Sequence, residues 1–231
     1  MTAIIHNLQA VRARIERAAS ACGRCGADIE LLAVSKTFPA RYIHEAFTAG
    51  QKAFGESYAQ EAEKKIPDLA ELGLQWHFIG PIQSNKTALI AERFDWVHSI
   101  EREKIAVRLN AARPDHLPPL QVCIQINVSG ESSKSGVAPG QELELARRIA
   151  NLPRLRLRGL MAIPEPTSDL TLQRRRFARV HALAQGLIAE GCVLDTLSMG
   201  MSDDLEAAIA EGATLVRVGT AIFGRRETLL P

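Results

Sequence analysis

The feature that most constrains the fold is a regular alternation of short apolar runs with longer amphipathic segments. Eight apolar runs are expected to be strands, at residues 31–35, 52–55, 75–79, 96–99, 120–128, 157–163, 196–198 and 215–218. Helical patterns follow at 39–50, 57–70, 85–93, 101–112, 140–151, 169–190 and 203–211, after an extra amino-terminal helix over 4–22. Strands that alternate with helices form parallel sheets. Eight such units predict an α/β fold, a single (β/α)8 TIM barrel over residues 1–231.

An open, doubly wound α/β sheet is the competing architecture. It is disfavoured because no expected strand is followed by the Gly-x-Gly-x-x-Gly pattern of dinucleotide-binding sheets. The length of 231 residues also suits one small barrel.

The charge and composition exclude several kinds of partner. The net charge is +2, and the one dense basic cluster, 174–176, is interpreted as a solvated helix face, so no nucleic-acid partner is expected. No run approaches ~18 apolar residues, and the amino terminus lacks a signal-peptide layout, so no membrane partner is expected. Four scattered cysteines favour a reducing cytoplasm. Cys22 and Cys25 lack the second pair that a zinc site needs.

A lysine stands at the end of the first expected strand. Active sites of TIM barrels lie at the carboxyl ends of the strands, and Lys36 directly follows the run 31–35. A partly buried lysine amine has a lowered pKa and attacks carbonyl groups to form Schiff bases. Taken alone, Lys36 is also compatible with a lysine that ends a strand in solvent.

Small residues dominate the loops after the seventh and eighth strands. The first loop runs from Ser198 through Met199 and Gly200 to Ser202, and the second contains Gly219 and Thr220. Such loops leave main-chain N–H groups open, and phosphate sites of TIM barrels are often built there. Ordinary turn chemistry, with Ser202 capping the next helix, is the alternative. The neighbouring residues 203 and 204 are acidic, so a phosphate site requires their side chains to point away.

Other polar residues of the expected strands and loops remain open to two interpretations. Arg217 interrupts an apolar strand, and is either a site residue or the partner of a carboxylate on a helix. His77 and His98 lie in strands and are either core histidines or site residues, with no carboxylate cluster to favour a metal. Asn85 opens a helix and Lys134 lies in a polar loop, where helix capping and a mobile surface loop are the simpler explanations.

Eight short segments, in order along residues 30–226, together resemble one family. The sequence is similar to the pyridoxal phosphate homeostasis protein family in the segments Ala33–Lys36, Phe54–Glu56, Trp76–Gly80, Gln83–Lys86, Ser133–Gly136, Gly159–Met161, Ser198–Asp203 and Arg217–Gly224. The combination is specific, although any single tetrapeptide is weak evidence. Ser57 stands where many members of that family have Asn.

The resemblance implies a pyridoxal 5'-phosphate (PLP) site in a barrel akin to the amino-terminal domain of alanine racemase. By this similarity Lys36 forms the Schiff base with PLP, and Arg217 faces the pyridine nitrogen, which keeps the ring a weak electron sink. The residues expected to hold the phosphate are Ser198, Ser202, Gly219 and Thr220. Further candidates for contact with the cofactor are Met199, Gly200, His77, Asn85 and Lys134.

The resemblance also implies a role in PLP homeostasis rather than turnover. Racemases of this fold type add a second domain with acid–base groups, and only thirteen residues follow Val218 here, so we expect no such domain. The leading hypothesis is a cytoplasmic, monomeric carrier that buffers PLP and delivers it to apo forms of PLP-dependent enzymes. A PLP-dependent amino-acid racemase is the alternative. A Schiff-base aldolase without cofactor, acting on a sugar phosphate, is a third possibility.

Overall fold

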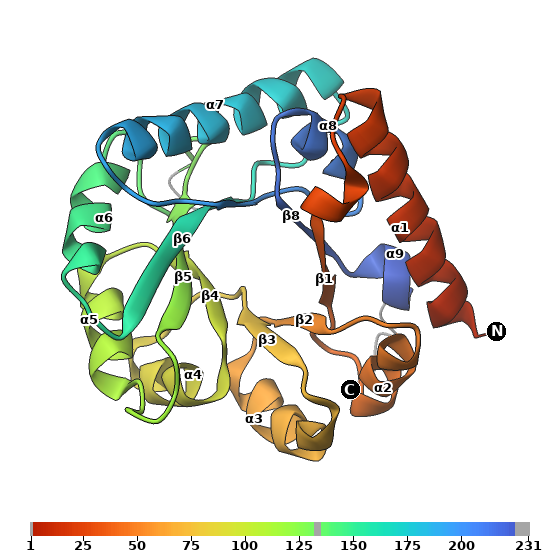
Figure 1. Ribbon diagram of the computed structural model, residues 1–231, viewed down its shortest axis with the longest axis horizontal. Coiled ribbons are helices and arrows are strands. Elements are labelled where there is room, and N and C mark those ends of the chain that lie inside the picture. Colours follow the sequence, from red (N-terminus) through yellow and green to blue (C-terminus); the bar gives the residue numbers. More distant parts are fainter. Residues whose placement is uncertain (1, 132–134, 225–231) are drawn as a thin grey trace.

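Eight parallel strands pair in sequence order, and the last one closes on the first. The computed structural model describes residues 2–131 and 135–224. Every strand pairs with its neighbours along the chain and β8 pairs with β1, which confirms the predicted barrel (Figure 1). The strands are β1 (Glu30–Val34), β2 (Ala53–Glu56), β3 (Gln75–Phe78), β4 (Trp96–Ile100), β5 (Leu120–Ile126), β6 (Leu155–Ala162), β7 (Thr196–Ser198) and β8 (Leu215–Val218).

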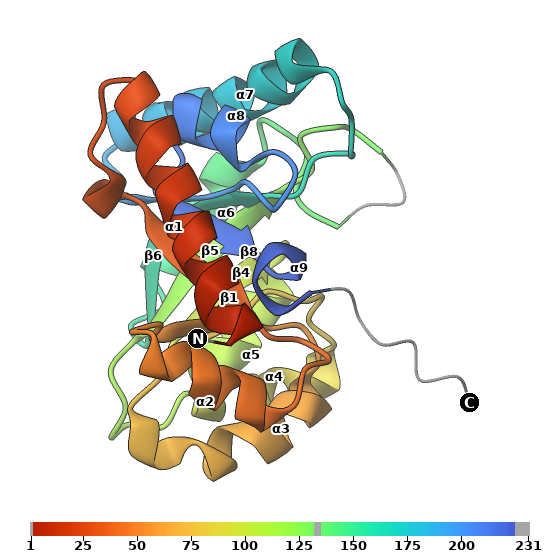
Figure 2. The ribbon, with the colours of Figure 1, turned by 90° about the vertical axis from the view of Figure 1, so that its right-hand side faces the viewer.

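Helices surround the barrel, as Figures 1 and 2 show. They are α1 (Ala3–Ala21), α2 (Ala40–Thr48), α3 (Ala59–Asp68), α4 (Thr87–Arg93), α5 (Glu103–Ala112), α6 (Glu142–Ala150), α7 (Leu170–Ala189), α8 (Leu205–Ala210) and α9 (Thr220–Phe223). Single 3-10 turns lie at Gly26–Asp28, Ala70–Leu72 and Ser84–Lys86. In α1 the apolar face buries Ile4, Leu8, Val11, Ile15 and Ala19. Of the described helices, none is long and apolar enough to span a membrane.

The expected element boundaries are wrong by one to two residues at several ends. Strand β5 ends at Ile126 rather than residue 128, because the N–H of Asn127 turns to the carbonyl of Val137. The expected helices included the turns that flank them, as at 57–70 around α3. The pattern also missed α9, which is too short for a helical period to be visible.

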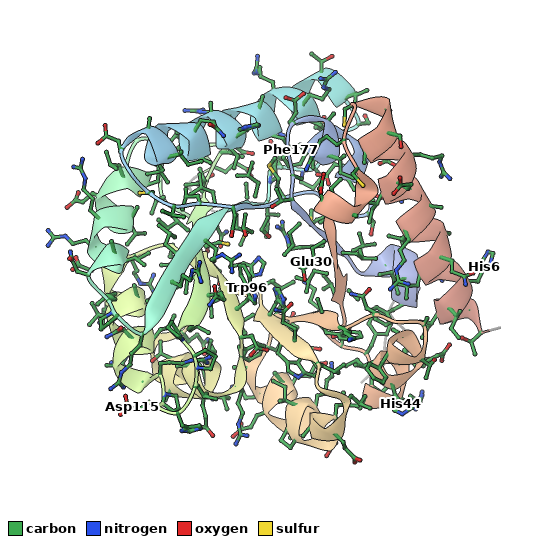
Figure 3. All side chains as sticks on the ribbon, viewed as in Figure 1. His6, Glu30, His44, Trp96, Asp115 and Phe177 are labelled. Carbon is green, nitrogen blue, oxygen red and sulfur yellow. The ribbon has the colours of Figure 1, made fainter. Side chains whose placement is uncertain are left out.

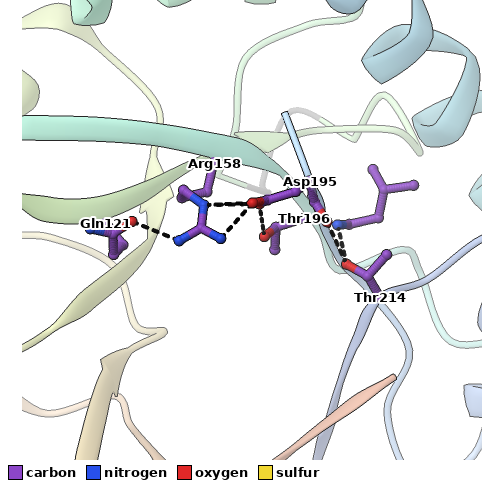
Figure 4. Close-up of polar contacts among 6 residues, drawn as sticks. Gln121, Arg158, Asp195, Thr196 and Thr214 are labelled. Atoms are coloured by element: carbon purple, nitrogen blue, oxygen red, sulfur yellow. Dashed lines mark hydrogen bonds and ion pairs between the residues drawn. The ribbon is translucent and has the colours of Figure 1, made fainter. Parts of the chain in front are cut away.

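An ion pair lies at the amino-terminal ends of β6 and β7. The guanidinium of Arg158 lies on the carboxylate of Asp195 and donates to Oε1 of Gln121 over 2.8 Å (Figure 4). It also lies 4.8 Å from the ring centre of Trp96, which points toward the middle of the barrel in Figure 3. This end stabilises the barrel, whereas TIM-barrel sites form at the opposite, carboxyl-terminal end.

Candidate active site

A cavity of about 270 Å³ lies at the carboxyl-terminal end of the barrel. Its polar lining comes from β8 itself and from residues that follow β1, β2, β7 and β8. The lining residues are Val34, Lys36, Phe38, Ser57, Ile79, Ile163, Met201, Ser202, Asp203, Arg217, Gly219 and Thr220. The apolar part of this lining was not predicted from the sequence. A signal for it existed, because alternate residues of a strand lie on one face. Val34 stands two residues before Lys36, and Ile79 stands two residues after His77.

Barrel closure brings Lys36 to the loop after β8. Ala33 of β1 pairs with Val218 of β8, so Lys36 and Gly219 both lie just beyond paired residues. The two strands are neighbours in Figure 1 although some 180 residues separate them along the chain. An added Cβ at Gly219 would come within 3.2 Å of the carbonyl oxygen of Val34, which favours glycine where these two strands end.

Arg217 is a buried cation that also lines the cavity. Its side chain is 3% exposed; Nη1 donates to Oγ of Ser198 over 2.7 Å, and Nη2 donates to the carbonyl of Ala162 over 2.9 Å. Burial lowers the pKa of Arg217 to about 10, while Asp204 and Cys123 oppose that shift. Arg217 therefore keeps its charge at neutral pH, and its five N–H donors leave some for a ligand.

A chain of buried polar side chains continues from Arg217 down the barrel. Oγ of Ser198 lies 2.7 Å from Nδ1 of His98, and Nε2 of His98 lies 2.9 Å from Nδ1 of His77. Burial lowers the pKa of His77 to about 3, and burial together with His77 and Arg217 lowers the pKa of His98. Both rings are therefore neutral, and each joins one neighbour as donor and the other as acceptor.

Two of the expected site residues, Ser198 and His77, belong to this series of hydrogen-bonded side chains. Ser198 and His77 are fully buried and do not line the cavity, so they reach it only through Arg217. The ring of His77 stacks on Trp96 with 5.4 Å between ring centres. The core interpretation of His77 that the sequence left open therefore agrees with its surroundings.

The loop after β7 places Ser202 on the cavity. Gly200 adopts φ 94°, and its carbonyl accepts from the N–H of Arg217 over 2.9 Å. Met199 is fully buried in the core. The expectation that Ser202 caps α8 is wrong, because Asp204 precedes that helix.

The two acidic residues of this loop differ in direction. The carboxylate of Asp204 accepts from the N–H of Met201 over 2.6 Å, so it is turned into its own loop. Asp203 lines the cavity beside Ser202. The condition that both carboxylates point away is thus met for Asp204 alone.

Of the remaining candidates, Asn85 is not among the residues that line the cavity. Asn85 is exposed in the 3-10 turn before α4, and Lys134 lies outside the described residues. Cys22 and Cys25 are both exposed free thiols. Within residues 2–131 and 135–224 no group of three or more His, Cys, Asp or Glu side chains could hold a metal.

Comparison with known proteins identifies the family. A family model described as "Alanine racemase, N-terminal domain" matches residues 4–227. The chain is 60% identical over 227 residues to the pyridoxal phosphate homeostasis protein of Pseudomonas aeruginosa, a match that covers 98% of this chain and 97% of that protein. The chain belongs to the pyridoxal phosphate homeostasis protein family.

Solved structures place this member of the pyridoxal phosphate homeostasis protein family among its relatives. PipY of Synechococcus elongatus PCC7942, in a structure with PLP bound, is 34% identical with a TM-score of 0.83, and the match covers 96% of this chain and 100% of PipY. Alanine racemase from Corynebacterium glutamicum has a TM-score of 0.69 at 17% identity, covering 99% of this chain and 64% of that enzyme. At that identity the racemase shows a shared fold alone.

Proposed function

We propose that this chain binds PLP covalently at Lys36, and that it buffers the cofactor and delivers it to other proteins. The observation that carries the proposal is one cavity lined by both the amine of Lys36 and the buried guanidinium of Arg217. PLP needs an amine for its aldehyde and cationic or N–H donors for its phosphate and ring nitrogen. The family membership and the PLP bound in PipY support the same cofactor.

The donor set of the cavity fits the three parts of PLP. The hydroxyls of Ser202 and Thr220, with the main chain at Gly219, suit the phosphate, because all three follow the ends of β7 and β8. The carboxylate of Asp203 on the same lining opposes an anion, and since this residue is exposed its side chain can turn into solvent when the phosphate binds. Arg217 suits the pyridine nitrogen. When bound, PLP supplies an aldehyde that condenses with a primary amine, forming a C=N bond and releasing water. Lys36 would provide that amine, and the apolar side chains of Val34, Phe38 and Ile79 would pack against the ring.

Two features favour a carrier over a racemase. An arginine facing the ring nitrogen keeps it unprotonated, which makes PLP a weak electron sink. Racemisation also requires acid–base groups on two faces of the substrate. A tyrosine could serve as one of them, but neither Tyr42 nor Tyr58 lines the cavity. The rim is open at Ile163, which is 37% exposed, and this suits release of the cofactor. The proposal extends to a monomer in the cytoplasm, with apo PLP-dependent enzymes as recipients.

Lys36→Ala tests the covalent site. The wild-type protein is incubated with PLP and reduced with borohydride, which makes the bond to the amine permanent. Peptide mass spectrometry should find the modification at Lys36, and the visible absorbance of the protein should disappear in Lys36→Ala. Lys52→Ala, which removes an exposed lysine, serves as the control and should keep both signals. Covalent PLP on another lysine in Lys36→Ala would refute the assignment.

Proton exchange separates the carrier from the racemase. The protein loaded with PLP is incubated with alanine in deuterated water, and α-deuterium is followed by NMR. The carrier predicts no exchange above that of free PLP. Exchange at rates of about 1 per second or more, typical of enzymes, would establish the racemase alternative.

A further inference from the structure

The residue after Lys36 has a strained main chain. Among the described residues Thr37 is the one non-glycine residue with a positive φ, at 69°. Such a conformation costs roughly 1–2 kcal/mol for a residue with a Cβ, and it persists only where the surroundings hold it. The turn 35–37 carries Lys36 into the cavity, so what holds this turn also aims the amine.

Side chains hold the residues on both sides of Lys36. Before it, the fully buried Ser35 donates its hydroxyl to Oε1 of Glu56 over 2.7 Å. After it, the main-chain N–H of Thr37 donates to Oε1 of Glu61 over 2.7 Å. Glu56 ends β2 and Glu61 lies in the first turn of α3, so two different elements hold the turn.

One buried ammonium joins the two carboxylates. Nζ of Lys65 lies 2.8 Å from Oε1 of Glu56 and 2.6 Å from Oε1 of Glu61. It also donates to the carbonyl of Ser35 over 2.9 Å. An ammonium has three N–H donors, so these contacts use all of them. The charge of Lys65 is therefore committed to the turn and not to the cavity.

We infer that Glu56, Glu61 and Lys65 form a positioning cluster, which holds the strained turn at Thr37 so that the amine of Lys36 meets the aldehyde of PLP. The inference rests on the proposed function, because it concerns Lys36 as the cofactor's amine. None of the three residues lines the cavity, and the cluster acts through the hydroxyl and carbonyl of Ser35 and the N–H of Thr37.

Glu61→Ala is the decisive variant. It removes the acceptor of the Thr37 N–H and one of the two carboxylates beside Lys65, which keeps its ion pair with Glu56. Removing Lys65 would instead leave Glu56 buried without a cation, and in the described structure Oε2 of Glu56 already has no hydrogen-bond partner. Glu61→Gln keeps an acceptor oxygen, and Glu63→Ala removes an exposed glutamate from the same helix as a matched control.

Three readouts are measured on the full chain: the PLP concentration that gives half-maximal borohydride trapping at Lys36, the rate at which trinitrobenzenesulfonate labels Lys36 in PLP-free protein, and the free energy of unfolding in urea. Glu61→Ala is expected to need roughly tenfold to a hundredfold more PLP, as for the loss of one hydrogen bond to a charged group. Its Lys36 labelling rate should differ at least twofold from wild type. Glu61→Gln and Glu63→Ala should stay within about twofold of wild type in trapping.

Thr37→Gly provides the rescue. Glycine adopts a positive φ without a Cβ penalty, so the turn no longer depends on the cluster. Glu61→Ala combined with Thr37→Gly should therefore recover most of the lost affinity for PLP. A purely structural role would lower the unfolding free energy of Glu61→Ala without changing trapping or labelling, and that result would overturn the inference.

Failure of the proposed function looks different. If the wild-type protein traps no PLP at Lys36, the proposed function fails, and the labelling rate still decides the cluster. Equal labelling of Lys36 in wild type and Glu61→Ala would overturn the positioning role in either case. Failure of Thr37→Gly to restore Glu61→Ala would also overturn it, since strain at Thr37 would then not be what the cluster holds.

Discussion

The buried His77 predicts a specific loss of stability in acid. Burial lowers the pKa of this ring to about 3, from an ordinary value of 6.5. Between pH 6.5 and pH 3 the histidine of the unfolded chain is protonated while the folded His77 ring stays neutral. The unfolded state therefore binds one more proton than the folded state, and the free energy of unfolding decreases as the pH falls from 6.5 toward 3. The slope approaches about 1.4 kcal/mol per pH unit, which gives about 2 kcal/mol between pH 7 and pH 5 for this ring alone.

The assay compares urea unfolding at these two pH values for wild type and His77→Asn. In this variant the asparagine amide takes the place of Nδ1 of His77, so Nε2 of His98 keeps a hydrogen-bond partner. Desolvation raises the pKa values of the carboxyl groups of Glu30 and Glu56, and these groups shift stability in the opposite direction. Only the difference between the two proteins is therefore diagnostic. The loss between pH 7 and pH 5 should be smaller in His77→Asn by about 2 kcal/mol.

His44→Asn is the control for this experiment. His44 is exposed on α2 and lies at the outside of the molecule in Figure 3. Its removal leaves the barrel interior intact, so the wild-type pH dependence should remain. Equal losses in wild type and His77→Asn would show that the folded protein accepts a proton at His77, and would refute the reasoning from burial.

Three further changes, one of them with a matched control on α7, test the barrel and its cavity. Ser198→Ala should lower the unfolding free energy by about 1–3 kcal/mol, because Nδ1 of His98 loses its partner; no loss in urea titrations would argue against the chain. Gly159→Ala places a Cβ 1.7 Å from the carbonyl oxygen of Thr196, so β6 and β7 must separate and the melting temperature should fall sharply. Its control is Gly186→Ala on α7, where an added Cβ meets nothing within 4 Å and the free energy of unfolding should rise by roughly 0.5–1 kcal/mol. Arg217→Lys should weaken PLP retention about tenfold in equilibrium dialysis, because lysine lacks the planar fork of donors; unchanged retention would place Arg217 outside the site.

The barrel and the neighbourhood of Lys36 were predictable because both follow from periodicity. Strand–helix alternation implies a parallel sheet, and closure brings the ends of β1 and β8 together. The same periodicity could not place Ser198. Alternation gives the face on which a side chain lies, but not its height in the barrel. Ser198 pairs with Leu215, so Arg217 lies further along β8 and covers that hydroxyl.

The cluster around Thr37 left no readable signal in the sequence. Glu61 and Lys65 stand four residues apart, a spacing usual for solvent-exposed ion pairs on helices. Lys65 is buried, and its Nζ contacts Glu56 at the end of β2 and the carbonyl of Ser35 just after β1. A contact between a helix and two strand ends depends on helix packing, which a pattern along one element does not contain.

The closure of β8 on β1 has a consequence for the protein without its cofactor. A sheet with free edges exposes unpaired N–H and C=O groups that recruit other chains into aggregates. In this barrel every strand pairs with a strand on both sides, and these pairings involve the main chain alone. They therefore do not depend on a bound ligand. Loss of the cofactor therefore uncovers a cavity but no strand edge. We expect the empty form to stay dispersed at concentrations at which an open sheet would associate.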